Sequence, residues 1–201
     1  SVVDIQDNVV EVLASHGNNH LGGDDFDQKI VDHLVQFLKD THQVDITQSR
    51  KALALLTRVA EQAKMVLSDN PFVLIEEEYL YERDGVPVNL SLELSRHDYE
   101  AMIEDYLDET LEVVHIALNS ANLTVSDIDE VLLVGGSTRT PLVSQRLEEE
   151  FRQQPRGEVD PDLCVATGAA IQAAMIAGED VAASAVLVDI TPYTYGTSAL
   201  G

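Results

Sequence analysis

The amino-acid sequence predicts an α/β fold with an inserted α+β subdomain. Apolar residues recur at every fourth position in some segments and alternate with polar residues in others, so helices and strands are mixed along the chain. The run "VLLVGGSTRTP" (131–141) has the strand–turn–helix order of an α/β layer. The segment 47–125 has a helix, a strand pair and a further helix, which indicates an α+β insertion.

Composition limits the classes of function. The chain has 201 residues, of which 45% are hydrophobic, and 12 basic against 36 acidic residues give a formal charge of −24. This charge repels nucleic acid and anionic membranes, and favours a solvated acidic surface over a dedicated cationic partner. No apolar run approaches the roughly 18 residues of a membrane span, and no signal peptide opens the chain. The opening "SVVDI" is typical of the middle of a strand, so we expect a fragment of a longer protein. A single cysteine fits a reducing compartment, and we expect the protein to be cytoplasmic. The single cysteine, Cys164, is expected in the core and excludes an intrachain disulfide.

The first 45 residues predict a hairpin followed by a helix. Alternation around the "QDN" turn places the hairpin in residues 1–21. The helix follows Gly22, and one face carries Phe26, Ile30, Leu34 and Leu38. Three acidic residues are expected in its first turn, where they suit the helix dipole better than a metal site: Asp24, Asp25 and Asp27.

The middle of the chain predicts two helices around a strand pair. The first helix runs from about Thr47 to Leu67, with Leu55, Leu56, Val59, Ala63, Val66 and Leu67 on its buried side. Strand composition and an "RDG" turn predict an antiparallel pair over 71–94. Ser95 and Asp98 resemble a capping box. The helix that they open has an apolar stripe at Tyr99, Met102, Ile103, Tyr106, Leu107, Leu111, Val114 and Leu118.

The last third predicts a buried strand at 131–134 and two helices. The first helix has Val143, Leu147 and Phe151 at a spacing of four. In the second, Asp160 is the expected cap, and Gly178 ends the helix. Residues 1–45 and 128–185 are therefore assigned to the α/β subdomain, 46–127 to the insertion and 186–201 to a linker segment.

The glycine pair Gly135-Gly136 predicts a ligand contact. Glycine lets a ligand approach the backbone, and the first N–H groups of a helix attract phosphate. Ser137 is placed to cap the helix or to contact the ligand. Arg139 opposes the helix dipole, and stacking on a base or pairing with a phosphate would account for it. A tight turn with a surface arginine remains the alternative at this point.

Two further features support a nucleotide site. Glu61, Lys64 and Ser68 fall on one helical stripe and could contact a ribose and an adenine edge, although a solvated face is the simpler interpretation. Asp162 lies in a predicted first helical turn, with its carboxylate available to a neighbouring group.

Five motifs in order resemble those of the DnaK-type chaperones, the seventy-kilodalton heat-shock family. They are "HLGGDDFD" (20–27), "EQAKMVLS" (61–68), "VLLVGGSTRTP" (131–141), "DPDLCVATGAAIQ" (160–172) and "VLVDITP" (186–192). The resemblance covers essentially the whole chain. It implies the second lobe of an actin-like ATPase domain with a ribonuclease H-like layer, followed by the interdomain linker.

The resemblance implies contacts to ATP or ADP at ten positions. Glu61 and Lys64 would meet the ribose, and Ser68 would bond the adenine. The sugar and α-phosphate would lie next to Gly135 and Gly136, with Ser137 beside them. Arg139 would stack on the base. Asp162 would lie near the nucleoside, and Gly22 and Gly23 would face the phosphates.

The resemblance also implies what the full-length protein does. The family's catalytic and Mg²⁺-positioning residues would precede residue 1, so we expect no hydrolysis by this chain alone. The full-length protein would bind unfolded peptides, a J-domain co-chaperone and a nucleotide exchange factor in a heat-shock or stress response. Met65 after Lys64 favours a bacterial source, and Thr140 stands where the family usually has an apolar residue.

Two alternatives remain open. One is another actin-like superfamily member, such as a sugar kinase or a filament-forming protein, against which the "VLVDITP" tail argues. The other is a non-enzymatic module that binds a co-chaperone through residues 72–94.

Overall fold

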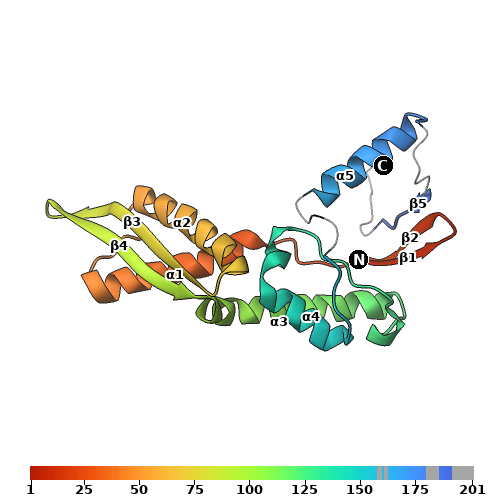
Figure 1. The fold of residues 1–201 in the computed structure, drawn as a ribbon, viewed down its shortest axis with the longest axis horizontal. Coiled ribbons are helices and arrows are strands. Elements are labelled where there is room, and N and C mark those ends of the chain that lie inside the picture. The colour runs from red at the N-terminus through yellow and green to blue at the C-terminus, as the bar shows by residue number, and fades with distance from the viewer. Residues whose placement is uncertain (158–159, 161–162, 180–185, 192–201) are drawn as a thin grey trace, which may run out of the picture. The chain divides into compact units, whose positions relative to one another are not determined.

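The structure, a computed structural model, describes residues 1–157, 160, 163–179 and 186–191. Within them the chain has a mixed α/β composition with two separate sheets, as Figure 1 shows. The chain divides into two compact units. Unit 1 comprises Ser1–Asn18, Glu109–Val134 and Leu147–Gly201, and unit 2 comprises Asn19–Asp108 and Gly135–Arg146. None of the described helices is long and apolar enough to cross a membrane. The predicted boundaries at 45, 128 and 186 stay a prediction.

Unit 1 contains the predicted N-terminal hairpin, which is confirmed. Strands β1 (Val2–Gln6) and β2 (Val9–Ala14) are antiparallel. Strand β5 (Val186–Val188) adds to β2 in parallel, and Val186 N donates to Asn8 O at 2.7 Å. A small core beside this sheet is formed by Val2, Ala14, Ala117 and Leu118.

Unit 2 begins with the predicted helix. Helix α1 spans Gly23–His42 and buries all four residues of its predicted apolar face. Asp24 and Asp25 lie in its first turn, but Asp27 does not: it lies further along, on the buried side. The first-turn position expected for Asp27 was therefore wrong, and its place on the helix turns it toward the core.

Helix α2 begins three residues later than predicted. It spans Arg50–Asp69, because the Ser49 hydroxyl accepts a hydrogen bond from Ala52 N at 3.3 Å and caps the helix there. Most of its predicted apolar side is buried or half-buried. Val66 was assigned to that side, but it is 40% exposed.

The predicted strand pair and its following helix are confirmed. Strands β3 (Phe72–Arg83) and β4 (Val86–Ser95) are antiparallel around an Asp84-Gly85 turn. Helix α3 spans Arg96–Ser120, and Asp98 N donates to the Ser95 hydroxyl at 3.0 Å, as the capping pattern predicted.

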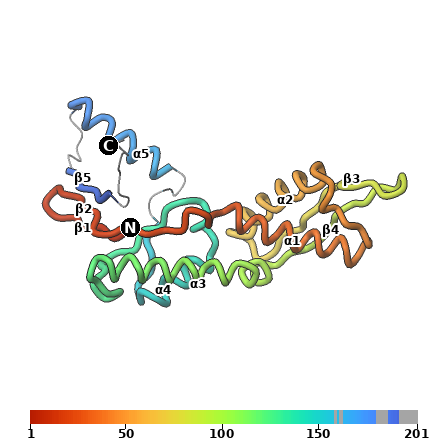
Figure 2. Tube along the Cα trace, turned by 180° about the vertical axis from the view of Figure 1, so that it is seen from behind, coloured from red at the N-terminus to blue at the C-terminus, as the bar shows by residue number. Residues whose placement is uncertain are grey.

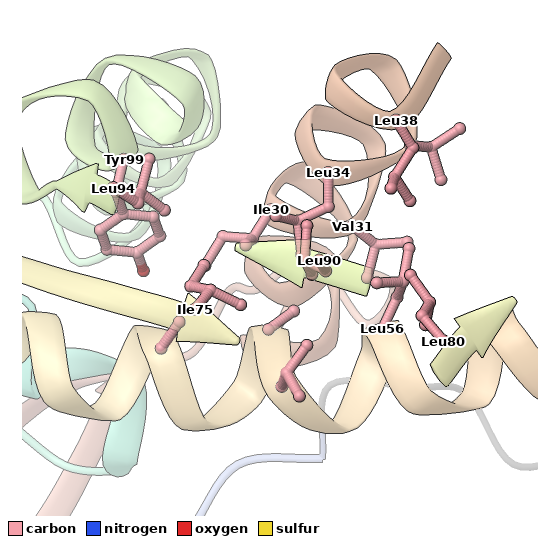
Figure 3. Packing of buried hydrophobic residues seen from close by; sticks show 14 of the residues in the cluster. Ile30, Val31, Leu34, Leu38, Leu56, Ile75, Leu80, Leu90, Leu94 and Tyr99 are labelled. Atoms are coloured by element: carbon pink, nitrogen blue, oxygen red, sulfur yellow. The ribbon is translucent and has the colours of Figure 1, made fainter. Parts of the chain in front are cut away.

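The core of unit 2 lies between its helices and its strand pair. Helix α1 packs against α2, and α2 packs against β3; the tube in Figure 2 shows the three running together. In Figure 3, side chains from all these elements meet, among them Ile30, Leu34, Leu56, Ile75, Leu80, Leu90 and Leu94. Burial of these apolar side chains is the main stabilising contribution to unit 2.

The buried strand predicted at 131–134 is not formed. In the described residues its backbone makes one isolated bridge, between Leu132 and Arg156, and Leu132 and Val134 are 63% and 53% exposed. A single bridge covers neither face of an extended segment, so these apolar side chains are not buried. The 3-10 helix η2 (Gly136–Arg139) follows, and then α4 (Pro141–Phe151) with Val143, Leu147 and Phe151 all half-buried.

The last described helix starts later than expected. Helix α5 spans Cys164–Ile176, whereas Asp160 was the predicted cap. Its end is as predicted: Gly178 N donates to Met175 O and Glu179 N to Ala174 O, the hydrogen bonds of a Schellman motif. Cys164, expected in the core, is half-exposed. The prediction for Asp162 and the last ten residues of the linker segment lie outside the described residues.

Candidate functional site

The glycine pair lies at a sharp turn of the backbone. Gly135 has φ +93°, a conformation that side-chain-bearing residues rarely adopt. The Thr138 hydroxyl donates to Gly135 O at 2.6 Å, and Thr138 N donates to the same oxygen at 3.1 Å. These two hydrogen bonds fix the loop that carries Gly136 and Ser137.

The predicted start of an α-helix directly after the glycine pair was wrong. Only the single 3-10 turn η2 follows Gly135, and α4 begins at Pro141. The N-cap of η2 is Gly135 instead of Ser137, and Arg139 ends η2 instead of opening an α-helix. Pro141 sets this boundary, because proline is well placed at the first position of a helix and constrains the residue before it. The expected dipole conflict of Arg139 therefore does not arise.

Three predicted site residues meet at the start of α1. A Cβ built on Gly23 would lie 2.9 Å from Ser137 Oγ and 3.1 Å from Lys64 Nζ. The Lys64 ammonium donates to Gly23 O at 2.9 Å. The absence of a side chain at Gly23 is thus what lets a hydroxyl and an ammonium lie against one stretch of backbone.

The Lys64 ammonium also contacts a buried carboxylate, that of Asp27. Lys64 Nζ lies 2.8 Å from Asp27 Oδ1, and the two side chains are 16% and 7% exposed. The contact is an ion pair, and apart from Lys64 the Asp27 Oδ1 atom has no hydrogen-bond partner within the described residues. Burial raises the pKa of Asp27, Lys64 opposes that rise, and Glu61 and Asp24 add to it.

The other predicted residues lie around this contact. Ser68 Oγ donates to Lys64 O at 3.4 Å, on the same helix. Gly22 N donates to Asp25 Oδ2 at 2.7 Å at the start of α1. Glu61, Gly136 and Arg139 are exposed in unit 2. These residues and the three around Gly23 belong to one compact unit, whereas Asp162 lies outside the described residues.

A second pair of contacts supports the glycine loop. The Tyr99 hydroxyl lies 3.4 Å from Thr140 Oγ1, and both residues are almost fully buried. Leu142 N donates to Glu100 Oε1 at 3.1 Å. Burial raises the pKa of Tyr99 to about 12, so its hydroxyl stays protonated at neutral pH. The first turns of α3 therefore hold the residues that follow η2.

Sequence reasoning missed the role of Asp27. The available signal was its position: Val31 follows four residues later on α1, and both residues are buried. A carboxylate on an apolar stripe requires a partner when it is buried. The stripe of Glu61, Lys64 and Ser68 was interpreted most simply as a solvated face, so Lys64 was not recognised as that partner.

Within the described residues, the site has no metal cluster. In the described part of the chain, no group of three His, Cys, Asp or Glu residues is placed to hold a metal ion. A cavity of about 420 Å³ lies elsewhere in unit 2, beside His42, Arg83 and Val88, and its lining includes none of the predicted site residues.

The Gly23 contact suits a polar ligand with a hydroxyl-rich or anionic group. Bare backbone permits close approach, the ammonium donates hydrogen bonds, and the Ser137 hydroxyl can donate or accept. A nucleotide fits this donor set: its sugar hydroxyls and phosphates are the acceptors that such donors recognise. The Asp27 carboxylate offsets the lysine charge, so hydroxyl contact is favoured over strong charge pairing at Lys64.

Comparisons with known proteins give a consistent result. The family model described as "Hsp70 protein" matches residues 1–201. Proteins named "Chaperone protein DnaK" from Thermosipho melanesiensis and Thermosipho africanus are 42% and 43% identical over 203 residues. A protein of the same name from Thermotoga neapolitana is 41% identical over 210 residues. Each match covers 100% of this chain and 34% of the relative, so the chain spans about a third of their length.

Proposed function

Because the chain belongs to the Hsp70 family, we propose that it is the second lobe of an actin-like ATPase domain and binds the adenosine part of ATP or ADP. The observation that carries this proposal is the meeting of Gly23, Lys64 and Ser137 at one point of unit 2. Their sequence separation is large, and a common ligand accounts for their convergence. Relatives named as chaperones do not favour a kinase or a filament protein.

Each predicted residue has a role in this proposal. Lys64 and Glu61 contact the ribose, and Ser68 bonds the adenine edge. The sugar and α-phosphate lie beside Gly135, Gly136 and Ser137, and Arg139 stacks on the base. Gly22 and Gly23 face the phosphates, and Asp162 lies near the nucleoside. The nucleotide brings its Mg²⁺ when the whole protein binds it, and the metal offsets phosphate charge.

The linker segment has a role of its own. Strand β5 lies within "VLVD" (186–189) and pairs with β2 in unit 1. This pairing supports the proposal that the segment docks on the ATPase domain and reports nucleotide state to a peptide-binding domain. In the whole protein, we propose, ATP binding and hydrolysis control the binding of unfolded peptides in the cytoplasm of a bacterium under stress. A J-domain co-chaperone and a nucleotide exchange factor regulate that cycle.

A calorimetric titration of this chain with ADP and Mg²⁺ tests the site. We expect weak binding that Arg139→Ala and Lys64→Ala each reduce. Arg50→Ala is the matched control, since Arg50 lies at the other end of α2, 14 residues or about 21 Å along the helix from Lys64. Binding that Arg139→Ala retains would remove Arg139 from the site. Absence of binding would show that this lobe alone does not form the site.

A further inference from the structure

We infer that Asp27 is a positioning residue of the nucleotide site, whose carboxylate holds the Lys64 ammonium against Gly23 and so aims it at the sugar of the ligand. The inference rests on the proposed nucleotide site and adds to it a residue on α1 that does not itself touch the ligand. Its basis is the ion pair between Asp27 and Lys64 and the backbone contact of Lys64 with Gly23.

The contacts of the Lys64 ammonium leave one of its N–H donors for a ligand. A lysine ammonium has three N–H donors. Within the described residues, one donates to Gly23 O at 2.9 Å and a second side of the ammonium faces Asp27 at 2.8 Å. Ser137 Oγ lies close to the same point. With two sides occupied, the flexible lysine stem is confined, and the remaining donor is available to a ligand acceptor beside Ser137.

The pair is poorly explained as a stabilising element. A buried ion pair recovers little more than the desolvation cost of its charges, and an apolar pair of similar volume is often as stable. Burial raises the pKa of Asp27 even though Lys64 is adjacent, so ionising this carboxyl group costs more free energy in the folded chain than in the unfolded chain. Apart from Lys64, Asp27 Oδ1 also has no hydrogen-bond partner among the described residues. A positioning role accounts for a charged residue retained at such a position.

A double-mutant cycle on ADP binding tests whether Asp27 acts through Lys64. We expect Asp27→Asn and Lys64→Met each to weaken the binding of ADP with Mg²⁺ by about tenfold, and the double variant to bind no more weakly than either. Asp32→Asn is the matched control, because Asp32 is exposed on the same helix and the charge change is identical. Losses that multiply in the double variant would overturn the inference, because independent effects are additive in free energy.

Acetylation of Lys64 provides a readout that needs no nucleotide. We expect Lys64, followed by mass spectrometry, to react with acetic anhydride about tenfold faster in Asp27→Asn than in the unmodified chain or in Asp32→Asn, on the order expected when a part-buried ion pair is lost. Equal rates would show that Asp27 does not hold the ammonium and would overturn the inference.

The outcomes separate this inference from the proposed function. If the unmodified chain binds ADP and Asp27→Asn binds it equally well, the inference fails and the nucleotide site stands. If the unmodified chain does not bind ADP, the preformed site fails, and the positioning role fails with it. Thermal unfolding of each variant, run beside the titrations, excludes misfolding as the cause of a loss.

Discussion

The Tyr99 hydroxyl lies 3.4 Å from Thr140 Oγ1 in a nearly dry part of unit 2, where the two residues are 1% and 2% exposed. This contact joins the first turns of α3 to the loop that carries Gly135, Ser137 and Arg139. The resemblance described in the sequence analysis implied an apolar residue at the position of Thr140. A hydroxyl there is explained by the partner that Tyr99 provides.

The Tyr99–Thr140 contact predicts non-additive effects on stability. Thr140→Val leaves the Tyr99 hydroxyl without this partner, and we expect it to lower the free energy of unfolding by about 1–3 kcal/mol. Tyr99→Phe likewise leaves the Thr140 hydroxyl without its hydrogen-bond partner. The double variant should cost less than the sum of the two, because neither polar group is then left alone. Urea denaturation measures all four proteins, and strictly additive losses would show that the hydroxyls do not interact.

The buried carboxylate of Asp27 predicts a change of stability with pH. Because burial raises the pKa of Asp27 in the folded state, its stabilising contribution is present below the unfolded pKa near 3.8 and is lost as pH rises through the folded pKa. Asp27→Asn lacks this titration. We therefore expect the stability of the unmodified chain, relative to Asp27→Asn, to fall as pH rises from the unfolded pKa through the raised folded pKa.

Chemical denaturation at a series of pH values measures this difference. Other acidic groups titrate in both proteins and cancel in the comparison. Asp32→Asn, exposed on the same helix, should follow the unmodified chain throughout. An opposite slope, with the unmodified chain gaining stability as pH rises, would mean that the attraction of Lys64 exceeds the desolvation of Asp27.

We expect the Gly23→Ala variant to fold but to bind nucleotide poorly. The Cβ of Gly23→Ala would lie 2.9 Å from Ser137 Oγ and 3.1 Å from Lys64 Nζ, so both groups must move. The lysine end is flexible and alanine favours the first turn of α1, so we expect a change in unfolding free energy below about 1 kcal/mol. ADP affinity should fall by about tenfold, since the displaced donors no longer face the ligand.

Gly17→Ala is the control for Gly23→Ala, because a Cβ at Gly17 would meet nothing within 4 Å. Calorimetric titration with ADP and Mg²⁺, run beside thermal unfolding, measures both properties. Undiminished affinity in Gly23→Ala would show that the space above Gly23 is not used by the ligand.

Much of unit 2 was predictable because its apolar residues follow a regular period. The spacing of Phe26, Ile30, Leu34 and Leu38 places α1, and the "RDG" turn places the strand pair. These features depend on neighbouring residues alone. The predicted start of α2 was three residues too early, because several polar residues in that stretch could cap the helix and Ser49 is the one that does.

Features that depend on distant residues were not predictable in the same way. The run at 131–134 has the composition of a buried strand, but burial requires neighbours on both faces, and Leu132 and Val134 are exposed. The candidate site divides similarly. The glycines and Lys64 follow from motifs, whereas the Asp27–Lys64 pair requires two helices to be packed together before it can be seen.

Arg96 forms a side-chain cap at the end of α2, and we expect this cap to contribute to stability. Its Nε donates to Leu67 O at 2.7 Å and its Nη2 donates to Ser68 O at 3.2 Å. These carbonyls belong to the last turn of α2, where unpaired carbonyls and the helix dipole both favour a cation. We expect Arg96→Ala to lower the free energy of unfolding by about 1.5–3 kcal/mol, the range for hydrogen bonds to charged groups.

Arg96→Lys distinguishes geometry from charge at this position. Lysine retains the cation but lacks the planar fork that reaches two carbonyls at once, so we expect it to recover less than half of the loss. Arg50→Ala, at the first turn of the same helix, should not destabilise the chain, because a cation there opposes the dipole. If Arg96→Lys were as stable as the unmodified chain, charge alone would account for the cap. The paired hydrogen bonds to Leu67 and Ser68 would then contribute little, and the end of α2 that carries Ser68 would be held by apolar packing.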